Sequence, residues 1–330
     1  MKPNALLLFP LLAACTDLDM VEITEQDVVL PATKVCAQDV VLHPTSDYVA
    51  LASLHQDFPN GGARLISATM LGTVTSSSGS ASPMQGLRIS CVGPENRMIQ
   101  TTENAIKGGG SLATKASLTI TGPGSWDCTL GGITMHTGAA LAITGSETCL
   151  SSAVSDAQDW PHWPADSANV GDGQRVRAGY STYVLKHDYA LASDVATFGV
   201  RGNIELTDIT GDASGTNIAE CMDSTADPTA PAYPRLYISA QQKSTTGYCG
   251  SRVVGPYLNT TISAKSHHKK VYPVLDNVPV SNALGCLPTF EVKVMVSALA
   301  GGNALCFHAA RYSNVVVVPQ SYDGPVNALN

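Results

Sequence analysis

Apolar and polar residues alternate along much of the chain, and a period of two is typical of β-strands that cover a core with one face. Leu87, Ile89 and Cys91 share one face of such a segment, and Arg88 and Ser90 share the other. Turn-rich stretches such as "SSSGSASP", "KGGGS" and "TGPGS" separate the segments, so we expect a series of antiparallel strands. The same alternation assigns inner faces to two further segments, with Leu112, Ala116, Leu118 and Ile120 in one and Trp126, Cys128 and Leu130 in the other.

The second half of the chain has the same pattern. An apolar period of about 3.6 residues is not sustained over three turns anywhere, and the strongest helical candidate, "YALASDVA", fits a strand and a turn equally well. The chain is therefore predicted to be all-β. The clearest strand is "TFEVKVMVSA", with Phe290, Val292, Val294 and Val296 inside and Glu291, Lys293 and Ser297 outside. A second, "ATFGVRGNIELTDI", places Phe198, Val200, Ile204 and Leu206 on one face.

We expect two antiparallel β-sandwich domains, immunoglobulin-like or jelly-roll-like, because 330 residues exceed the ~100–200 of one typical domain. The stretch "SSAVSDAQDWPHWPADSANVGDGQ" between the halves is polar and contains Pro and Gly, as domain connections do. The predicted divisions are a signal peptide at 1–14, an acidic tether at 15–35, a first sandwich at 36–150, a connection at 151–178 and a second sandwich at 179–330.

The nine cysteines divide unevenly until Cys15 is set aside, which leaves four in each half. Four cysteines in each sandwich allow about two disulfides, with the pairing left open, and indicate an oxidising compartment. Buried reduced thiols in a cytosolic protein are the alternative. The disulfide candidates are Cys36, Cys91, Cys128 and Cys149, then Cys221, Cys249, Cys286 and Cys306.

The first residues have the layout of an export signal, in which Lys2 precedes a short apolar stretch and then small residues before Cys15. The apolar stretch is shorter than the ~20 residues that cross a bilayer as a helix and fits a signal-peptide core. The sequence "LAAC" ending at Cys15 resembles the lipobox of bacterial lipoproteins. That resemblance implies lipidation of Cys15 and removal of residues 1–14; with Thr16 and not Asp after the cysteine, it also implies the outer membrane or cell surface. An ordinary cleaved signal and an uncleaved N-terminus are the alternatives.

Composition narrows the class of partner. Only 14% of residues are charged and the formal net charge is −8, so the surface is mostly neutral and no nucleic-acid partner is expected. The one compact basic run, "KSHHKK" at 265–270, is predicted to be a solvated basic turn.

Two tryptophans in the connection form the first candidate site. Trp160 and Trp163 bracket Pro161 and His162. One interpretation is that the two rings pack between the domains. The other is that Trp160, His162 and Trp163 form an exposed platform for a carbohydrate or a peptide.

Metal and cofactor signals are weak. Asp208 and Asp212 have the alternating spacing of a calcium loop, but Ala213 stands where the tight turn requires Gly. Cys306 and His308 lie two apart on one predicted strand face, but a disulfide-bonded Cys306 is favoured over a nucleophile–base pair. No metal and no cofactor are therefore expected.

No motif in the sequence indicates a class of reaction: Gly-x-Ser-x-Gly and His-Glu-x-x-His are both absent. We therefore expect a non-enzyme, namely a lipid-anchored cell-surface or periplasmic binding or structural module with a protein or glycan ligand. A self-assembling subunit of a filament, coat or virion is one alternative, so oligomerisation stays open. A secreted hydrolase with a non-contiguous active site is the other.

Overall fold

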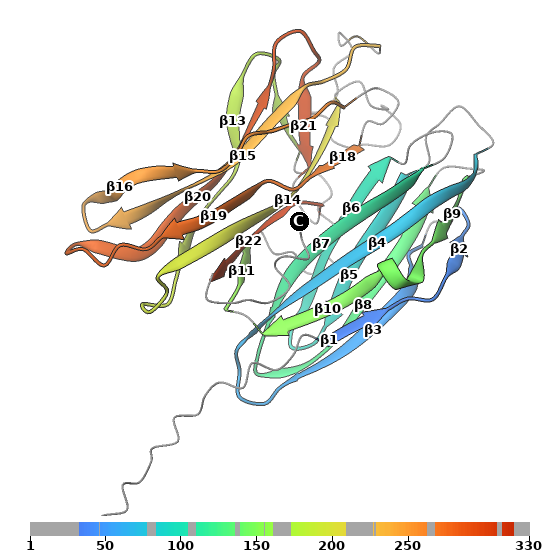
Figure 1. Cartoon of the computed structure of the whole chain (residues 1–330), viewed down its shortest axis with the longest axis horizontal. Coiled ribbons are helices and arrows are strands. Elements are labelled where there is room, and N and C mark those ends of the chain that lie inside the picture. The colour runs from blue at the N-terminus through green and yellow to red at the C-terminus, as the bar shows by residue number, and fades with distance from the viewer. Residues whose placement is uncertain are drawn as a thin grey trace, which may run out of the picture. The chain divides into compact units, whose positions relative to one another are not determined.

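The computed structural model shows an all-β chain, as the alternation predicts (Figure 1). It describes residues 33–45, 47–77, 84–104, 110–135, 139–154, 156–160, 173–208, 227, 229–262, 268–308 and 312–319. In these ranges helical structure is limited to a 3-10 turn, η1 (Gly145–Glu147), and a 3-10 position at residue 312, and no helix there is long and apolar enough to span a membrane. All strand pairs within the four sheets are antiparallel.

The first ten strands form two sheets, which we call the first sheet pair. In the four-stranded sheet the order is β3-β8-β5-β6, and in the six-stranded sheet β4 pairs with β7, β9 and β10, with β1 and β2 outermost. The strands are β1 (Thr33–Cys36), β2 (Val40–Leu42), β3 (Val49–Phe58), β4 (Ala63–Ser77), β5 (Met84–Val92), β6 (Asn96–Asn104), β7 (Ser111–Thr121), β8 (Gly124–Met135), β9 (Ala139–Ile143) and β10 (Cys149–Val154).

The remaining strands form the second sheet pair. Its seven-stranded sheet has the order β11-β22-β14-β21-β12, with β18 and β19 also paired to β14, and its five-stranded sheet has the order β13-β20-β15-β16, with β17 paired to β15. The strands are β11 (Gln158–Trp160), β12 (Gly173–Val176), β13 (Ser181–Ala190), β14 (Thr197–Asp208), β15 (Pro234–Ser244), β16 (Gly247–Val254), β17 (Leu258–Asn259), β18 (His268–Val271), β19 (Val274–Pro279), β20 (Cys286–Ala298), β21 (Leu305–His308) and β22 (Asn314–Pro319).

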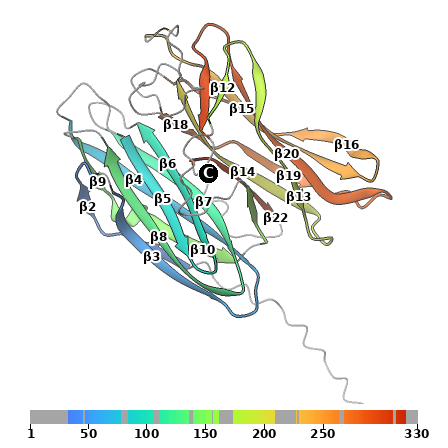
Figure 2. The ribbon, with the colours of Figure 1, turned by 180° about the vertical axis from the view of Figure 1, so that it is seen from behind.

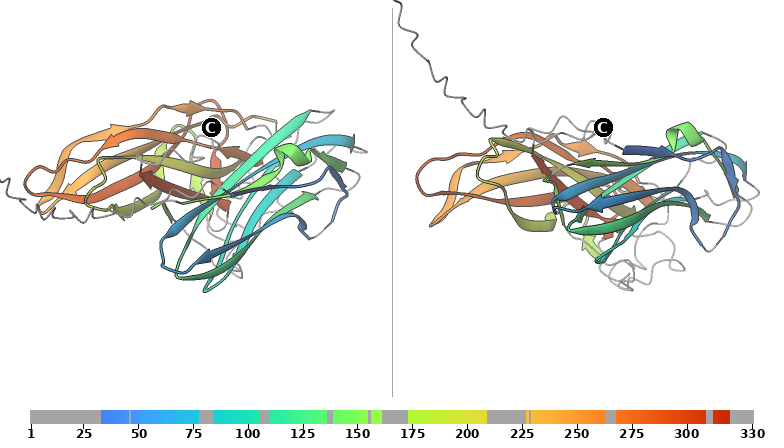
Figure 3. Two further views of the ribbon diagram at one scale, coloured as in Figure 1. Left: turned by 60° about the horizontal axis from the view of Figure 1, so that its bottom comes forward. Right: turned by 90° about the horizontal axis from the view of Figure 1, so that it is seen from below.

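Each sheet pair encloses its own hydrophobic core, because the inner faces of its two sheets face each other (Figure 3). The predicted inner residues Leu87, Ile89 and Trp126 lie in the first core. In the second core, Phe198 and Phe290 meet edge to face with ring centroids 4.6 Å apart. The alternation therefore identified the apolar inner faces correctly, and the fold is β-sandwich-like. Glu291, expected outside, is 3% exposed because basic side chains surround it. Both sheet pairs belong to one unit, Pro31–Asn330.

Three disulfides are described, and each joins two strands of the same sheet pair. Cys36–Cys149 and Cys91–Cys128 lie in the first pair, and Cys249–Cys286 lies in the second. Cys306 is disulfide-bonded as well, whereas Cys221 lies outside the described residues. No described bond crosses between the halves, in agreement with the four-and-four division of the sequence.

Strand boundaries depart from the predicted divisions in two places. β1 begins at Thr33, inside the range predicted to be a tether, and β11 and β12 lie inside the predicted connection at 151–178. Short strands of this kind add one or two hydrogen-bonded pairs at a sheet margin, where alternation over three or four residues gives too little signal.

The central strand β14 departs from the one-faced pattern that we expected. All but the first of its twelve residues are buried, including Arg201, Asn203 and Glu205 on the face that the alternation makes polar. That second face is covered because strands of the first sheet pair lie against it (Figure 2). A half-exposed strand was the wrong expectation for this segment.

Candidate functional site

The junction between the two sheet pairs holds the strongest cluster of buried polar groups. β6 and β7 are the outermost strands on this side of their sheets, and each turns a free edge towards the second sheet pair. A free edge presents unpaired N–H and C=O groups that need partners when they are buried. Here side chains of the second sheet pair supply those partners.

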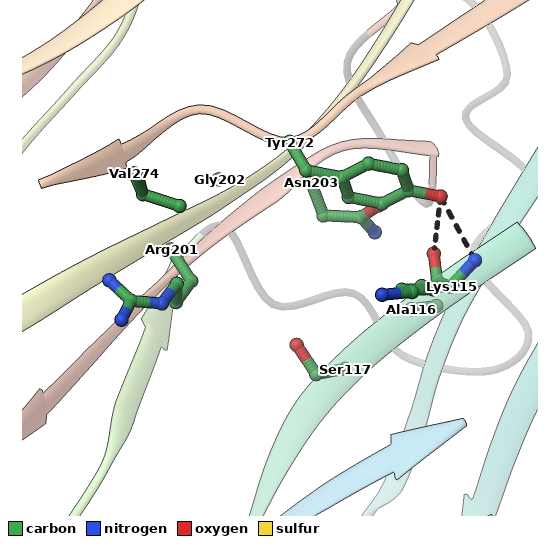
Figure 4. Close-up of a pocket in the computed structure, with 8 residues that line it drawn as sticks. All are labelled: Lys115, Ala116, Ser117, Arg201, Gly202, Asn203, Tyr272 and Val274. Atoms are coloured by element: carbon green, nitrogen blue, oxygen red, sulfur yellow. Dashed lines mark hydrogen bonds between the residues drawn. The ribbon is translucent and has the colours of Figure 1, made fainter. Parts of the chain in front are cut away.

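Tyr272 and Asn314 cover the middle of the β7 edge. The Tyr272 hydroxyl accepts a hydrogen bond from Lys115 N at 2.9 Å and donates one to Lys115 O at 3.1 Å (Figure 4). Two residues further along, Asn314 Nδ2 donates to Ser117 O at 2.8 Å. The spacing of two is the period with which a strand turns its backbone groups to one edge. Burial raises the pKa of Tyr272, which keeps its proton on the oxygen for the bond to Lys115 O.

Asp159, on β11, covers the next position of the same edge. Its carboxylate accepts from Thr119 N at 3.1 Å, from Thr119 Oγ1 at 2.7 Å and from Arg97 Nη2 at 2.6 Å. The Asp159 and Arg97 side chains are only 4% and 6% exposed. Both charges are therefore removed from water and depend on each other.

Glu205, on β14, covers the edge of β6 in the same way. Its two carboxylate oxygens accept from Thr102 N at 2.9 Å and from Thr102 Oγ1 at 2.6 Å. His268 Nδ1 lies 3.4 Å from one oxygen, and Lys270 Nζ lies 3.8 Å from the other. Burial by itself raises the pKa of Glu205, but the hydrogen bond from His268 and the charge of Lys270 lower it to about 2. Glu205 is therefore a buried carboxylate that stays ionised.

The basic residues around Glu205 correct one expectation, because Lys270 is buried and His268 and Lys269 are only partly exposed. His268, Lys269 and Lys270 belong to β18 and not to a solvated turn. Lys269 Nζ lies 2.6 Å from Glu103 Oε1 on β6, and Lys270 Nζ donates to the Tyr312 carbonyl. Burial lowers the pKa of Lys270 to about 8, although Glu205 acts in the opposite direction. Of the run at 265–270 the structure describes residues 268–270, and the expectation failed for them because their carboxylate partners are distant in sequence.

His308 completes the cluster as a neutral residue. It is 4% exposed, and its Nε2 lies 2.8 Å from Thr207 Oγ1. Burial, together with the charges of His268 and Lys270, lowers the pKa of His308 to about 4, although Glu205 raises it. The junction therefore combines an ionised carboxylate, buried cations and a neutral imidazole.

A small hollow opens beside Tyr272 between β7 and β14 (Figure 4). Asn203, which is 4% exposed, faces it, and among the described residues neither of its side-chain polar atoms has a hydrogen-bond partner. The volume is about 10 Å³, and ~10–15 Å³ is the space that a single water molecule needs. The hollow therefore suits a bound water and is too small for an organic substrate.

A second titratable cluster lies on the exposed face of β3 and β8. His55 Nδ1 lies 2.8 Å from Asp127 Oδ1, and its Nε2 lies 3.2 Å from Asp57 Oδ1. The hydrogen bond to Asp127 and the charge of Asp57 raise the pKa of His55. The Ser125 hydroxyl donates to Asp57 and not to His55, so the order of groups is not that of a Ser-His-Asp triad.

The sites expected from sequence are distributed as follows. Cys15, His162, Trp163 and Asp212 lie outside the described residues, and Trp160 is described only as part of β11. Asp208, the other calcium candidate, is 1% exposed, and its Oδ1 accepts from Asn303 Nδ2 at 3.3 Å. In the part of the chain that the structure describes, no group of three or more metal-ligating side chains comes together.

Sequence reasoning missed the residues that cover the edges, namely Asp159, Glu205, Tyr272 and Asn314. The only available signal was acidic or amide side chains inside strongly apolar segments, as at Glu205 in "GNIELTD" and Asn314 in "NVVVV". Such residues are buried only when they are paired.

Comparison with known proteins assigns no family. No family model and no curated protein sequence matches the chain. Among solved structures, infectious bursal disease virus strain Gx aligns with a TM-score of 0.28 and 7% identity, covering 91% of this chain and 74% of that one. The PBCV-1 virus capsid aligns with a TM-score of 0.25 and 8% identity, covering 88% of this chain and 95% of that one. A CBM22 tandem domain from Paenibacillus barcinonensis aligns with a TM-score of 0.24 and 10% identity, covering 88% of this chain and 94% of that one. Likenesses this weak carry no argument about fold or function.

Proposed function

We propose that this chain is an exported, non-enzymatic β-protein that acts as a binding or structural module at a cell surface, attached through a lipid on Cys15. We further propose that its two sheet pairs are two sandwich domains, immunoglobulin-like or jelly-roll-like. These domains present surfaces to partners outside the cell.

The observation that carries this proposal is the use made of the buried polar groups at the junction. Glu205, Asp159 and Tyr272 bond to backbone groups of β6 and β7. A catalytic site would instead leave a nucleophile or base facing a cavity that admits a substrate. Here the hollow beside these residues has room for about one water. The buried polar side chains therefore hold strands together, and contacts with partners are left to the outer surface.

Two features support export and anchoring. Disulfides such as Cys36–Cys149 and Cys91–Cys128 persist in oxidising compartments outside the cytosol. The lipobox-like "LAAC" supplies a lipidation site at Cys15. Membrane attachment through acyl chains gains ~0.8 kcal/mol per buried CH₂ and takes more than one chain for stable anchoring.

Expression of the full chain in a bacterium tests the proposal. We expect the protein in the membrane fraction, with a mass that shows loss of residues 1–14 and an added diacylglyceryl group on Cys15. Cys15→Ser is expected to abolish the lipid and the cleavage at this site. A soluble wild-type protein with an unmodified Cys15 would contradict the anchor.

A self-assembling subunit is the second candidate, and the edge strand β2 favours it. β2 is outermost in its sheet, and Val40 and Val41 are 38% and 47% exposed. An edge with exposed β-branched residues is suited to pairing with another chain. Light scattering at increasing concentration distinguishes the candidates, because assembly predicts oligomers that Val41→Lys dissolves, whereas a monomer at all concentrations argues against assembly.

A further inference from the structure

The outer face of the five-stranded sheet carries one row of aromatic and apolar side chains. Tyr183, Met295 and Tyr237 are cross-strand neighbours on β13, β20 and β15. Tyr257, between β16 and β17, continues the row, with its ring centroid 4.9 Å from that of Tyr237. Tyr183 and Tyr257 are 52% and 57% exposed. The row therefore presents rings to solvent across the sheet.

Cations lie over the rings at both ends of this tyrosine row. The Nζ atoms of Lys186 and Lys293 lie 5.9 Å and 5.8 Å from the centroid of Tyr183. At the other end the Arg235 guanidinium lies 5.6 Å from the centroid of Tyr257. These distances are within the range of cation–π attraction, so the cations lie beside the rings of the row.

The sheet that carries the row is cationic, although the chain is acidic. Its five strands hold five Lys or Arg and two Asp or Glu, a net charge of +3 on a chain of −8. Glu291 is surrounded, with Lys293 Nζ 2.6 Å and Lys186 Nζ 3.0 Å away, so it leaves a surplus of positive charge beside the tyrosines. The charged residues are Lys186, Arg235, Lys243, Arg252 and Lys293, with Asp188 and Glu291.

The row is long and narrow. Tyr183, Met295 and Tyr237 lie on three neighbouring strands and span ~10 Å, since strands lie ~4.8 Å apart, and the Tyr257 ring lies a further 4.9 Å from that of Tyr237. On one side the next cross-strand row is polar, with Ser181, Ser297 and Arg235. On the other side the row holds Lys186, Lys293 and Ser239 and ends at Val254 of β16. Stable protein interfaces bury a broad apolar centre, which a stripe one residue wide does not offer. Its shape suits an extended chain.

We propose that the tyrosine row binds an acidic polysaccharide, that is, a glycan chain with carboxylate or sulfate groups. Tyrosine offers an apolar ring face with a hydroxyl at its edge, which matches the C–H face and peripheral hydroxyls of a sugar ring. Lys186, Lys293 and Arg235 lie where they can meet the acidic groups. This inference rests on the proposed surface-binding function and names the ligand class of one face.

Calorimetric titration of the intact protein with polygalacturonate oligosaccharides tests the proposal. Neutral maltooligosaccharides and a single-stranded DNA oligomer are titrated in parallel. We expect the wild-type protein to bind polygalacturonate, more weakly as salt is added, and to bind the other two ligands at least about tenfold more weakly. Tyr183→Ala and Arg235→Gln should each weaken binding several-fold.

Arg64→Gln is the matched control, because Arg64 also lies over an aromatic ring, at 5.1 Å from Phe58, but on β4 of the first sheet pair. Circular dichroism of each variant checks that it is folded. Wild-type protein that does not bind polygalacturonate, equal binding of the DNA oligomer, or equal weakening by Arg64→Gln would overturn the inference. If the wild-type protein forms an oligomer and Tyr183→Ala makes it monomeric, the row serves self-association, and this result would also overturn the inference.

The two proposals fail separately. A lipidated Cys15 with no binding of polygalacturonate leaves the anchored module in place and removes only the glycan. Conversely, an unmodified Cys15 together with tyrosine-dependent binding of polygalacturonate would reject the lipid anchor and support the glycan-binding row.

Discussion

At the scale of single residues, Glu205 is the side chain on which the junction depends most. Glu205→Gln would leave one acceptor for the two donors of Thr102 and would remove the negative charge beside Lys270, whose side chain is 0% exposed. Removing one partner of a buried ion pair costs ~3–5 kcal/mol because the other charge stays buried. We expect the free energy of unfolding to fall by about that amount in urea titrations.

Glu95→Gln is the control for this substitution. Glu95 also belongs to an ion pair, with 3.2 Å from Arg97 Nη1 to Glu95 Oε1, but its side chain is 49% exposed. Because the Glu95 carboxylate is half exposed and Arg97 keeps its buried partner Asp159, the loss should be close to the ~0–1 kcal/mol of a surface pair. Equal losses from Glu205→Gln and Glu95→Gln would show that burial does not decide the effect.

His308 makes stability depend on pH. Its pKa is about 4 in the folded protein and 6.5 ordinarily, so the unfolded chain takes up a proton first as the pH falls. Stability is therefore lost between pH 6.5 and 4, by about 3 kcal/mol from this group. Glu205, with its pKa lowered from 4.5 to about 2, adds a loss below pH 4.5, whereas the raised pKa of Glu103 acts in the opposite direction.

His308→Gln isolates this contribution, because the amide can bond to Thr207 but does not titrate. We expect urea midpoints of the variant to change less than those of the wild-type protein between pH 6.5 and 5. Parallel pH profiles for the two proteins would mean that His308 is not the group responsible.

At the scale of elements, the β7 edge is held by side chains where a sheet would have another strand. Asp159→Asn replaces one of the two oxygens that bind Thr119 and Arg97 with an amide group that donates. The Thr119 amide should then exchange its hydrogen faster, whereas Leu118, which pairs with Ile66 of β4, keeps its protection. Hydrogen exchange followed by NMR measures both, and unchanged exchange at Thr119 would contradict this role.

The elements also show what the sequence can and cannot predict. The strands containing Leu87, Trp126 and Phe290 were predictable, because their alternation depends only on neighbours along the chain. The second covered face of β14 was not, since Thr102, the partner of Glu205, lies 103 residues away along the chain. The burial of Lys270 was not either, because Glu205 and the Tyr312 carbonyl, which it meets, form no local pattern with it. A basic run has the same sequence whether its charges are solvated by water or paired with carboxylates distant along the chain.

For the whole molecule, the division into halves follows from the cysteines, but the junction does not. The four-and-four distribution reflects bonds that close within each sheet pair, such as Cys91–Cys128 and Cys249–Cys286. The junction contains no described disulfide and only a small apolar cluster, in which Leu65 of β4 meets Val316 and Val318 of β22. Buried polar contacts therefore carry most of the coupling between the two cores.

This coupling predicts how the molecule unfolds. Separation of the sheet pairs would expose the β6 and β7 edges and break the Glu205 and Asp159 contacts together, so we expect one cooperative calorimetric transition for the wild-type protein. Glu205→Gln combined with Asp159→Asn removes the main ties and should split the transition in two, one for each core. Lys243→Gln, which breaks the ion pair with Asp188 on the five-stranded sheet, should leave a single transition. Two transitions in the wild-type protein, or a single one in the double variant, would show that the junction does not couple the cores.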